Sequence, residues 1–397
     1  MSDFDIIIIG GGLAGSALAI GLAQAGRRIA LVEAFQPRAD SRPSFDDRTL
    51  VVNAASLNIL GHLNVLDDAL HTQPLRRIEI SRAGAPGHLT LNAADFGHAR
   101  FGAVIVAREL GAALLRRLDA SDQIETLCPE RLKDIRQTPD HVEILLESGR
   151  RLTCKLLVGA DGSGSLTRRL AGIASTTSSY NQSALVFNVH SPGRPGDTAF
   201  ERFARGGPLA FLPQPDKRLG VVLVDLTEVI DGIKAVDDRA LTALLARRSG
   251  WPAEKFSSPG KRVSYPLALT RTRRPLSTRT AIVGNAANTV NPVSAQGFNL
   301  ALRDVAALID HAAPAQDPGT PAVLEAWFAD RHADQAATVR YTDTLARAFS
   351  NPSMLMRTGT SLGLMAHAAW PALQKRLVRA AMGFREPVST LAREHRP

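Results

Sequence analysis

A run of glycines between two apolar segments limits most strongly how this chain can fold. Residues 5–9 are short and rich in isoleucine, Leu13–Ala25 is rich in Ala and Leu and stops before Gly26, and residues 29–33 are mostly apolar again. This order predicts a strand, a tight turn, a helix and a second buried strand. We therefore expect one βαβ unit of a parallel sheet at the start of an α/β protein.

The turn itself fits the pattern G-x-G-x-x-G. Gly10 permits the tight turn, Gly12 lets the backbone approach a pyrophosphate, and Gly15 allows the helix to pack closely on the sheet. The N-terminus of the helix offers free N–H groups and a partial positive charge to phosphate. Glu33, at the end of the second strand, is spaced to accept hydrogen bonds from an adenosine ribose. The pattern predicts a dinucleotide site, with a glycine-rich turn beside a surface glutamate as the alternative, and does not by itself separate NAD from FAD.

The middle of the chain changes character. Short strand-like runs separated by Gly and Pro predict an antiparallel sheet inserted into the parallel one; they are residues 183–190, 198–204, 208–212, 219–226 and 262–267. After a buried strand at 281–284 the chain turns helical, with 314–321 as a linker. We expect a Rossmann-like cofactor domain (1–75 with 100–175 and 276–312), a substrate-binding sheet domain (76–99 with 176–275) and a C-terminal helical region (313–397).

Three further motifs follow the glycine turn. Phe45-Asp46-Asp47-Arg48 precedes an expected helix, and Asp161–Arg168 has the form D-G-x-x-S-x-x-R after a strand. Gly284-Asn285-Ala286-Ala287 follows a third strand and leads into Asn291–Leu300. Pro292 and Gly297 bracket a loop that opens a helix expected over 298–311, so its first amides can face negative charge.

These motifs, in this order, resemble those of the aromatic-ring flavoprotein hydroxylases, the single-component FAD monooxygenases with a p-hydroxybenzoate hydroxylase-like fold. The segments Phe200–Phe203, Tyr265–Leu269 and Gln296–Leu300 are more similar to the ubiquinone-biosynthesis branch, which hydroxylates 2-polyprenyl-6-methoxyphenol. The resemblance runs from the first strand to the C-terminal helices. It implies FAD as cofactor, O2 as co-substrate and attack on the phenol ring through a flavin C4a-hydroperoxide. Hydroxylation at another ring position, another phenol, and a non-catalytic prenyl-binding protein on this fold stay open.

The resemblance also assigns residues to the cofactor site, and no acid or base among them. Contacts to FAD are expected from Arg48, Arg108, Asp161, Asn285, Gly297 and Asn299, with Pro292 and Gln296 in the loop beside the flavin. Ala295 stands where the family usually has Gly. A surface pair is the alternative for Arg48 and Arg108, and a turn-forming role is the alternative for Asp161.

Other enzyme classes fit the sequence less well. A flavin halogenase would be expected to carry W-x-W-x-I-P, and the tryptophans are Trp251, Trp327 and Trp370. A prenyl-carrying chaperone similar to the GDP-dissociation inhibitors would not need the Asp161 and Pro292 motifs. A plain NAD dehydrogenase lacks a paired catalytic His or Tyr/Lys arrangement. With only one nucleotide turn, electrons are expected from NAD(P)H docked at the flavin or from a reductase partner.

Charge and composition bear on partners and location. The chain has 47 Lys+Arg against 38 Asp+Glu, but the basic residues are scattered and aromatics make up only 5%, so no nucleic-acid binding is expected. Residues 350–397 combine seven Lys or Arg and two Glu with apolar side chains at roughly helical spacing. This predicts either peripheral membrane contact or a helix packed on its own domain.

Two cysteines and an acidic start, without a signal peptide, favour the cytoplasm, at the inner face of the membrane if the C-terminal region binds lipid. The expected partners are a prenylated phenol and other ubiquinone-biosynthesis proteins, and no metal is expected.

Overall fold

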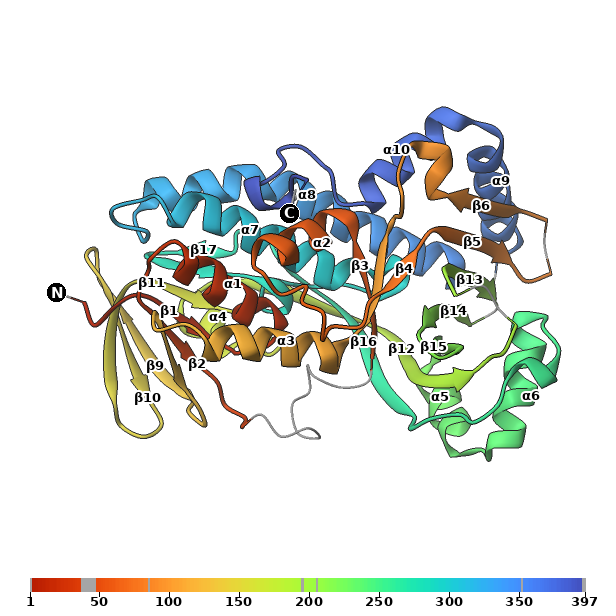
Figure 1. Cartoon of the computed structure of the whole chain (residues 1–397), viewed down its shortest axis with the longest axis horizontal. Coiled ribbons are helices and arrows are strands. Elements are labelled where there is room, and N and C mark those ends of the chain that lie inside the picture. Colours follow the sequence, from red (N-terminus) through yellow and green to blue (C-terminus); the bar gives the residue numbers. More distant parts are fainter. Residues whose placement is uncertain are drawn as a thin grey trace.

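Two large sheets lie at opposite ends of the long axis of the molecule (Figure 1). The computed structural model describes residues 2–36, 48–84, 86–193, 196–204, 206–350 and 353–394, with only the backbone for 294, 350 and 354–357. The first sheet has the order β17-β18-β11-β1-β2-β8, and β10 and β9 extend it from β11. Its strands are β1 (Phe4–Ile9), β2 (Ile29–Val32), β8 (Ile124–Leu127), β9 (Leu132–Gln137), β10 (Val142–Leu146), β11 (Arg151–Gly159), β17 (Leu276–Ser277) and β18 (Thr280–Ile282).

The predicted βαβ unit is present at the centre of this sheet. β1 pairs with β2 in parallel, from Ile6 opposite Ile29 to Ile9 opposite Val32. The helix between them, α1 (Leu13–Gln24), is buried over most of its length against the sheet and neighbouring helices. Because β11 and β18 are parallel to β1, the carboxyl ends of these strands meet at one edge, where α/β proteins place their ligands.

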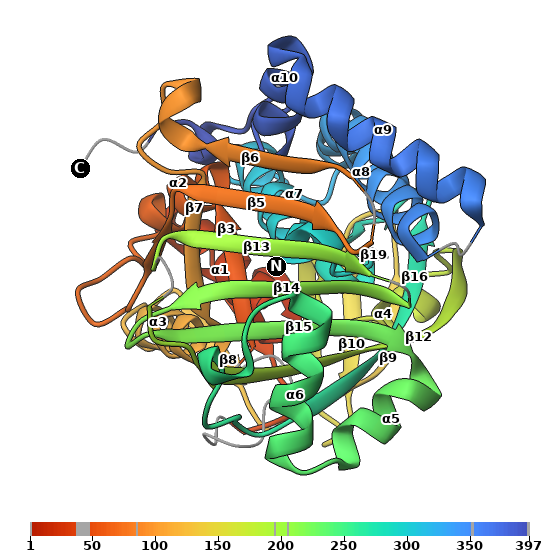
Figure 2. The ribbon, with the colours of Figure 1, turned by 90° about the vertical axis from the view of Figure 1, so that its right-hand side faces the viewer.

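The second sheet is the antiparallel one that the sequence predicts, with one parallel pair. Its order is β19-β16-β12-β15-β14-β13-β5-β6, and β13 runs parallel to β5. Its strands are β5 (Arg77–Arg82), β6 (His88–Asn92), β12 (Ser175–His190), β13 (Thr198–Ala204), β14 (Gly207–Gln214), β15 (Arg218–Leu226), β16 (Val263–Thr272) and β19 (Asn288–Thr289). The helices α5 (Thr227–Ala235) and α6 (Asp238–Ser249) cover its outer face (Figure 2). The other face of the second sheet points toward the first sheet.

Helices and a small sheet bridge the two large sheets. The small sheet has the order β3-β7-β4, and α2, α3 and α4 flank the cofactor-side strands. These elements are β3 (Thr49–Asn53), β4 (Gln73–Leu75), β7 (Gly102–Val106), α2 (Ala54–His62), α3 (Ala107–Asp119) and α4 (Leu166–Leu170). The predicted division into three domains stays a prediction, although residues 76–99 and 176–275 contribute nearly all of the second sheet.

The C-terminal part is helical, as expected. It comprises α7 (Gln296–Ala312), α8 (Pro321–Ser350), α9 (Met354–Ala369) and α10 (Pro371–Ala381), so α7 begins two residues before the predicted start. A buried charge cluster fixes α8 on α7: Arg303 bonds to Asp334 at 2.8 Å, and Arg331 bonds to Asp304 at 2.8 Å and to Asp334 at 2.6 Å. Burial alone would raise the pKa of Asp334, but the two arginines hold it well below its usual range. Over the described residues, no helix has the length and hydropathy needed to cross a membrane.

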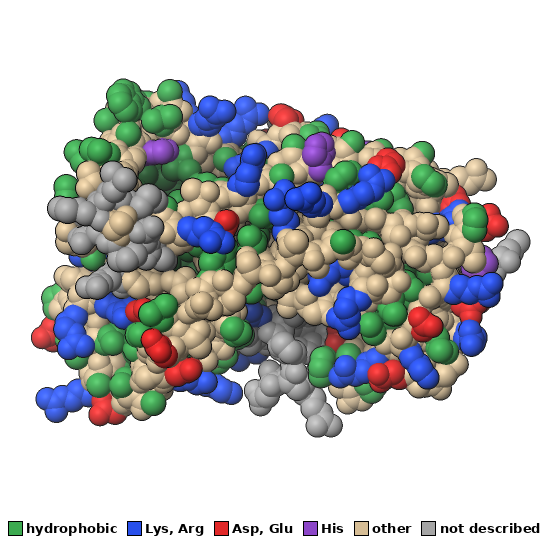
Figure 3. Space-filling view, turned by 180° about the vertical axis from the view of Figure 1, so that it is seen from behind, with side chains coloured by type: hydrophobic (Ala, Val, Ile, Leu, Met, Phe, Trp, Pro, Cys, Tyr) green, Lys and Arg blue, Asp and Glu red, His purple; other side chains and the backbone are tan. Residues whose placement is uncertain are grey.

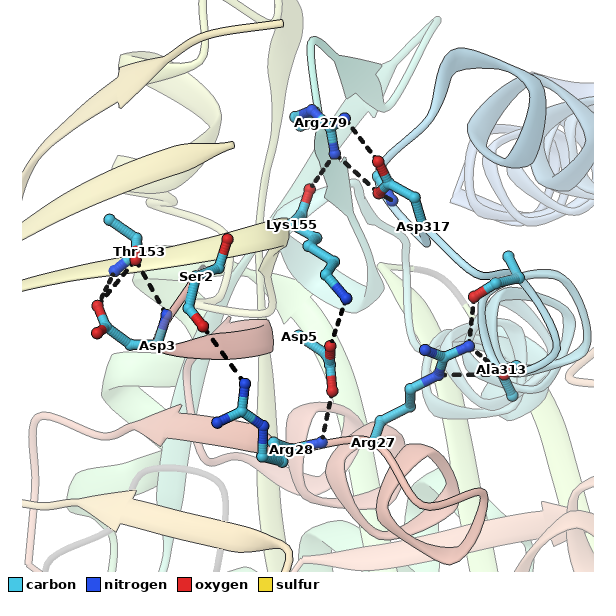
Figure 4. Close-up of polar contacts among 12 residues, drawn as sticks. Ser2, Asp3, Asp5, Arg27, Arg28, Thr153, Lys155, Arg279, Ala313 and Asp317 are labelled. Atoms are coloured by element: carbon cyan, nitrogen blue, oxygen red, sulfur yellow. Dashed lines mark hydrogen bonds and ion pairs between the residues drawn. The ribbon is translucent and has the colours of Figure 1, made fainter. Parts of the chain in front are cut away.

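Polar contacts tie the amino ends of the first sheet together, at the edge away from the glycine turn (Figure 4). Lys155 donates to Asp5 at 2.9 Å, and Arg279 pairs with Asp317 at 2.7 Å. Arg27 donates to the carbonyl of Ala313, 2.6 Å away. These contacts join strands to the segment between α7 and α8, which leaves the opposite, carboxyl edge open for a ligand.

Candidate active site

Two glycines of the turn have no room for a side chain. Gly10 has φ +106°, and a Cβ there would lie 2.5 Å from the carbonyl oxygen of Ala160. A Cβ at Gly15 would lie 1.9 Å from the carbonyl oxygen of Gly10. Gly12 precedes α1 in an extended conformation, and no side chain caps that helix. The first amides of α1 are therefore available to an anionic group, as the glycine pattern requires.

Glu33 lies beside this turn. Its carboxylate accepts the N–H of Gly11 at 2.7 Å and the N–H of Phe35 at 2.9 Å. An ionised carboxylate has about four acceptor positions, so capacity for ribose hydroxyls is left. The two backbone bonds orient Glu33 against the glycine turn, and its contact with the ribose stays a prediction.

Asp161 organises the loop after β11. It accepts hydrogen bonds from the N–H and the hydroxyl of Thr167, both at 3.0 Å, and from the hydroxyl of Ser165. Ser165 in turn caps α4 by accepting the N–H of Arg168 at 2.9 Å. Asp161 therefore has the turn-forming role that the sequence offers as an alternative to cofactor contact. It also lines the cavity described below.

The third motif is tied to the second. Arg168 donates to the carbonyls of Ala286 and of Ser163. Ala295 has φ +50°, a left-handed conformation that glycine adopts at lower cost, which explains why the family usually has Gly at this position. Asn299 stabilises that turn: it donates to the carbonyl of Ala295 at 2.7 Å and to that of Val51 at 2.8 Å, and accepts the N–H of Asn53 at 2.9 Å.

The two predicted arginines lie in different surroundings. The guanidinium of Arg48 lies over the ring of Tyr265, 4.9 Å from its centroid, and Arg48 lines the cavity. Arg108 is the second residue of α3, is exposed and is not among the described residues that line the cavity, so its contact with FAD stays a prediction. Residues 45–47 of the first motif lie outside the described residues. The prediction that a helix follows this motif directly is wrong, because strand β3 follows Arg48 and α2 begins only at Ala54; the run Thr49-Leu50-Val51-Val52 favours a strand.

Residues of all these motifs line one cavity of about 850 Å³. At one end it is lined by the glycine turn, Glu33, Asp161 and Asn285, and at its middle by Pro292, Gln296, Gly297 and Asn299. At the other end the inner face of the second sheet and helices α8 and α10 enclose it with mainly apolar side chains. Those side chains include Ile78, Ile80, Leu91, Ala210, Leu212, Val222, Val224, Leu267, Tyr341 and Met382. The cavity therefore has a polar, backbone-rich end and an apolar end.

These features fit FAD. Gly10 and Gly15 allow close backbone approach, α1 and α7 both start without a side-chain cap, and neither has an acid in its first turn. Two helix N-termini that border one cavity suit a pyrophosphate and the electron-rich edge of a reduced flavin. Among the described residues, no group of three or more His, Cys, Asp or Glu side chains is arranged to hold a metal ion.

A titratable residue that the sequence motifs do not mark also lines the cavity. Glu201 on β13 lies in the apolar end, and burial raises its pKa to about 7. The sequence does place Glu201 two residues after Ala199 in the strand Thr198–Ala204, so the two side chains are expected on the same face of the sheet. Tyr265 and Tyr341 also line this end, and nothing in the local sequence distinguishes Tyr341 from other helical tyrosines.

The chain is similar to known flavoproteins over most of its length. The family described as FAD binding domain matches residues 3–342. Over 96% of its length the chain is 33% identical to the ubiquinone hydroxylase UbiL of Rhodospirillum rubrum, covering 89% of that protein. It is 32% identical to 3-demethoxyubiquinol 3-hydroxylase of Escherichia coli, over 96% of this chain and 98% of that one. The structure of PqsL, a probable FAD-dependent monooxygenase from Pseudomonas aeruginosa, superposes with a TM-score of 0.77 at 22% identity, covering 91% of this chain and 99% of that chain.

The chain belongs to the FAD-dependent aromatic monooxygenases, in their ubiquinone-hydroxylase branch. It is a flavin-dependent aromatic monooxygenase, and the Rhodospirillum rubrum relative is a ubiquinone hydroxylase. When bound, FAD supplies the activation of O2 and the transfer of one oxygen atom. The chain's own residues would bind and orient it: the uncapped start of α1 would hold the phosphates, and the 292–297 loop and the start of α7 would lie beside the flavin. The apolar walls of the cavity would exclude water from a ring bound there.

Proposed function

We propose that this chain hydroxylates the phenolic ring of a polyprenylated ubiquinone precursor, with 2-polyprenyl-6-methoxyphenol as the substrate. The observation that carries this proposal is the apolar end of the cavity, which belongs to the same 850 Å³ space as the nucleotide end. Pocket walls of this kind bind apolar ligands with few polar contacts. NAD(P)H docked at the flavin, or a reductase, supplies the electrons.

A cell deleted for this protein should accumulate 2-polyprenyl-6-methoxyphenol and stop making quinone. The readout is mass spectrometry of the lipid extract. Restoration by the wild-type gene is the control. Normal quinone in the deletion strain would contradict the proposal.

Another ring position is a second candidate, because the Escherichia coli relative is a 3-demethoxyubiquinol 3-hydroxylase. The same deletion distinguishes the two candidates. Accumulation of a demethoxyubiquinol in place of the methoxyphenol would assign the 3-hydroxylation.

We also propose that α9 and α10 contact the membrane surface. Four large apolar side chains on or between these helices are exposed: Leu362 (58%), Met365 (47%), Trp370 (61%) and Leu373 (38%). Figure 3 shows apolar side chains gathered over this corner, with basic ones nearby, and Lys375, Arg376 and Arg379 of α10 are exposed. Basic and apolar side chains on one helix suit an anionic lipid surface.

The packing of α10 favours this role over simple packing on its own domain. Leu364, Val378 and Met382 are buried, as the packing alternative requires, but Leu377, Val378, Ala381 and Met382 also line the cavity. One side of α10 thus faces the cavity while Leu373 and Lys375 face solvent. A prenyl chain drawn from a lipid surface beside α10 would have a short path to the ring site.

Substitutions on α9 and α10 can test membrane contact while the cavity stays intact. Truncation near residue 350 would remove the cavity wall formed by α10, so substitutions are preferable. The triple variant Leu362→Ser, Met365→Ser and Trp370→Ser should lose flotation with phosphatidylcholine/phosphatidylglycerol liposomes while its FAD content stays unchanged. Leu226→Ser, an exposed leucine (45%) beside α5, is the matched control. Equal flotation of the triple variant and the wild type would contradict membrane contact through these helices.

A further inference from the structure

Glu201 is the acid that the second sheet contributes to the cavity, among the described residues that line it. It lies on β13 opposite Ala210 of β14 and Ile80 of β5, and both partners also line the cavity. Register partners on neighbouring strands share one face of a sheet. The carboxylate of Glu201 therefore lies in the inner, apolar face of the sheet, where the ring of a substrate would bind.

The neighbours along β13 enclose this carboxylate. Ala199, two residues before Glu201, lines the cavity, and Phe203, two residues after, stacks on Phe349 of α8 with ring centroids 3.6 Å apart. No hydrogen bond or ion pair joins Glu201 to any other residue that the structure describes. An unpaired carboxylate in such a place is costly to keep ionised, and an acid of this kind inside a cavity is a candidate to exchange a proton with a ligand.

Several charged or titratable side chains line the cavities on the two sides of β13. In the main cavity they are Arg48, Tyr265 and Tyr341, with Glu33, Glu130, Arg131 and Asp161 also in its lining; in a smaller cavity of about 560 Å³ that Glu201 also borders they are Glu79, Arg82, His88 and Arg202. Glu79 pairs with Arg77 at 2.9 Å. Burial is the cause that raises the pKa of Glu201 to about 7, which is where a general base is most effective near neutral pH.

We propose that Glu201 accepts the proton of the substrate's phenolic hydroxyl while the ring is hydroxylated. This inference rests on the proposed function, since it needs a phenol in the apolar end. In the step, the phenolic O–H bond breaks, its electron pair stays on the ring oxygen, and a new O–H bond forms on the carboxylate of Glu201. The ionised oxygen donates electron density to the ortho and para carbons, which makes them better nucleophiles toward an electrophilic oxygen. The oxygen atom and the electrons come from O2 and the reduced cofactor, and Glu201 releases its proton to solvent as product leaves.

The test uses FAD-loaded protein and a short-chain probe, 2-methoxy-6-prenylphenol, together with its ring-fluorinated counterpart. Glu201→Gln should lower kcat about 100-fold, remove the acidic limb near pH 7 from the kcat profile, and leave KM and FAD content within about threefold of wild type. The fluorinated phenol ionises more easily, so it should restore much of the lost rate. Glu201→Asp should retain the acidic limb. Glu79→Gln, an acid-to-amide change on the neighbouring strand, is the matched control and should behave as wild type.

A spectroscopic readout separates proton acceptance from packing. Infrared difference spectra should show a carboxylic acid C=O band that titrates near pH 7 in the wild type and is missing in Glu201→Gln. If the wild type hydroxylates the probe while Glu201→Gln keeps both its rate and its acidic limb, this inference is overturned and the proposed function stands. If FAD-loaded wild type hydroxylates neither phenol, the proposed function is overturned and this inference with it.

Discussion

Acids at the two ends of the cavity are held in different ways. At the nucleotide end, Glu33 accepts two backbone N–H groups, and Asp161 accepts one backbone N–H and two hydroxyls. At the sheet end, Glu201 has no such donor among the described residues and is surrounded by apolar side chains. Carboxylates that accept several hydrogen bonds shape a loop, whereas a carboxylate without them is available to exchange a proton with a ligand.

The largest effect is expected at the nucleotide end, where backbone approach to phosphate decides binding. Gly12→Asp places a carboxylate at the uncapped start of α1, where it would meet the pyrophosphate. Asp is a favourable N-cap residue, so the helix should persist while FAD affinity falls at least about 100-fold and the purified protein becomes colourless. Flavin absorbance and circular dichroism together measure this outcome.

The matched control for this prediction is Gly232→Asp. Gly232 is exposed on α5, and a Cβ there meets nothing within 4 Å. This variant should stay yellow. A yellow Gly12→Asp protein with normal FAD content would show that the start of α1 does not hold the phosphates.

A smaller effect is expected at the sheet end, where replacing Glu201 should increase the stability of the protein. The pKa of Glu201 rises from 4.5 to about 7 on folding, so between these pH values the folded state binds more protons than the unfolded state. Stability is therefore lost as pH rises through this window and stays lower above pH 7. Glu201→Gln should raise the free energy of unfolding by about 2–3 kcal/mol at pH 8 and by almost nothing below pH 4.5. Urea unfolding at the two pH values measures the difference.

An equal gain at both pH values would mean that the amide improves packing and that Glu201 is not held at a raised pKa. A loss of stability at pH 8 would mean that Glu201 has a stabilising partner there. Either result would remove the contrast between the two ends of the cavity.

The nucleotide end could be predicted from sequence because its determinants are local. Gly10, Gly12, Gly15 and Glu33 lie within one βαβ unit, and the spacing of the unit alone places them together. The role of Glu201 could not be predicted in this way, because its surroundings depend on the parallel pairing of β13 with β5, more than 100 residues apart in the chain. Asn299 shows the same limit: the sequence predicts a cofactor contact, whereas its hydrogen bonds to Val51 and Asn53 depend on how α7 packs against β3.

The smallest expected effect concerns Asp161, and it tests whether acids at the nucleotide end act mainly by shaping loops. Asp161→Ala removes the acceptor for the Thr167 amide and for the Ser165 hydroxyl, so the loop that leads into α4 loses its fixed geometry. We expect a loss of about 1–2 kcal/mol in the free energy of unfolding, the size typical of a lost helix cap, together with weaker FAD binding. Asp231→Ala, on the exposed face of α5, is the control. If Asp161→Ala weakened FAD binding without any loss of stability, Asp161 would act by direct contact with the cofactor, and the two ends of the cavity would differ less than their hydrogen bonds indicate.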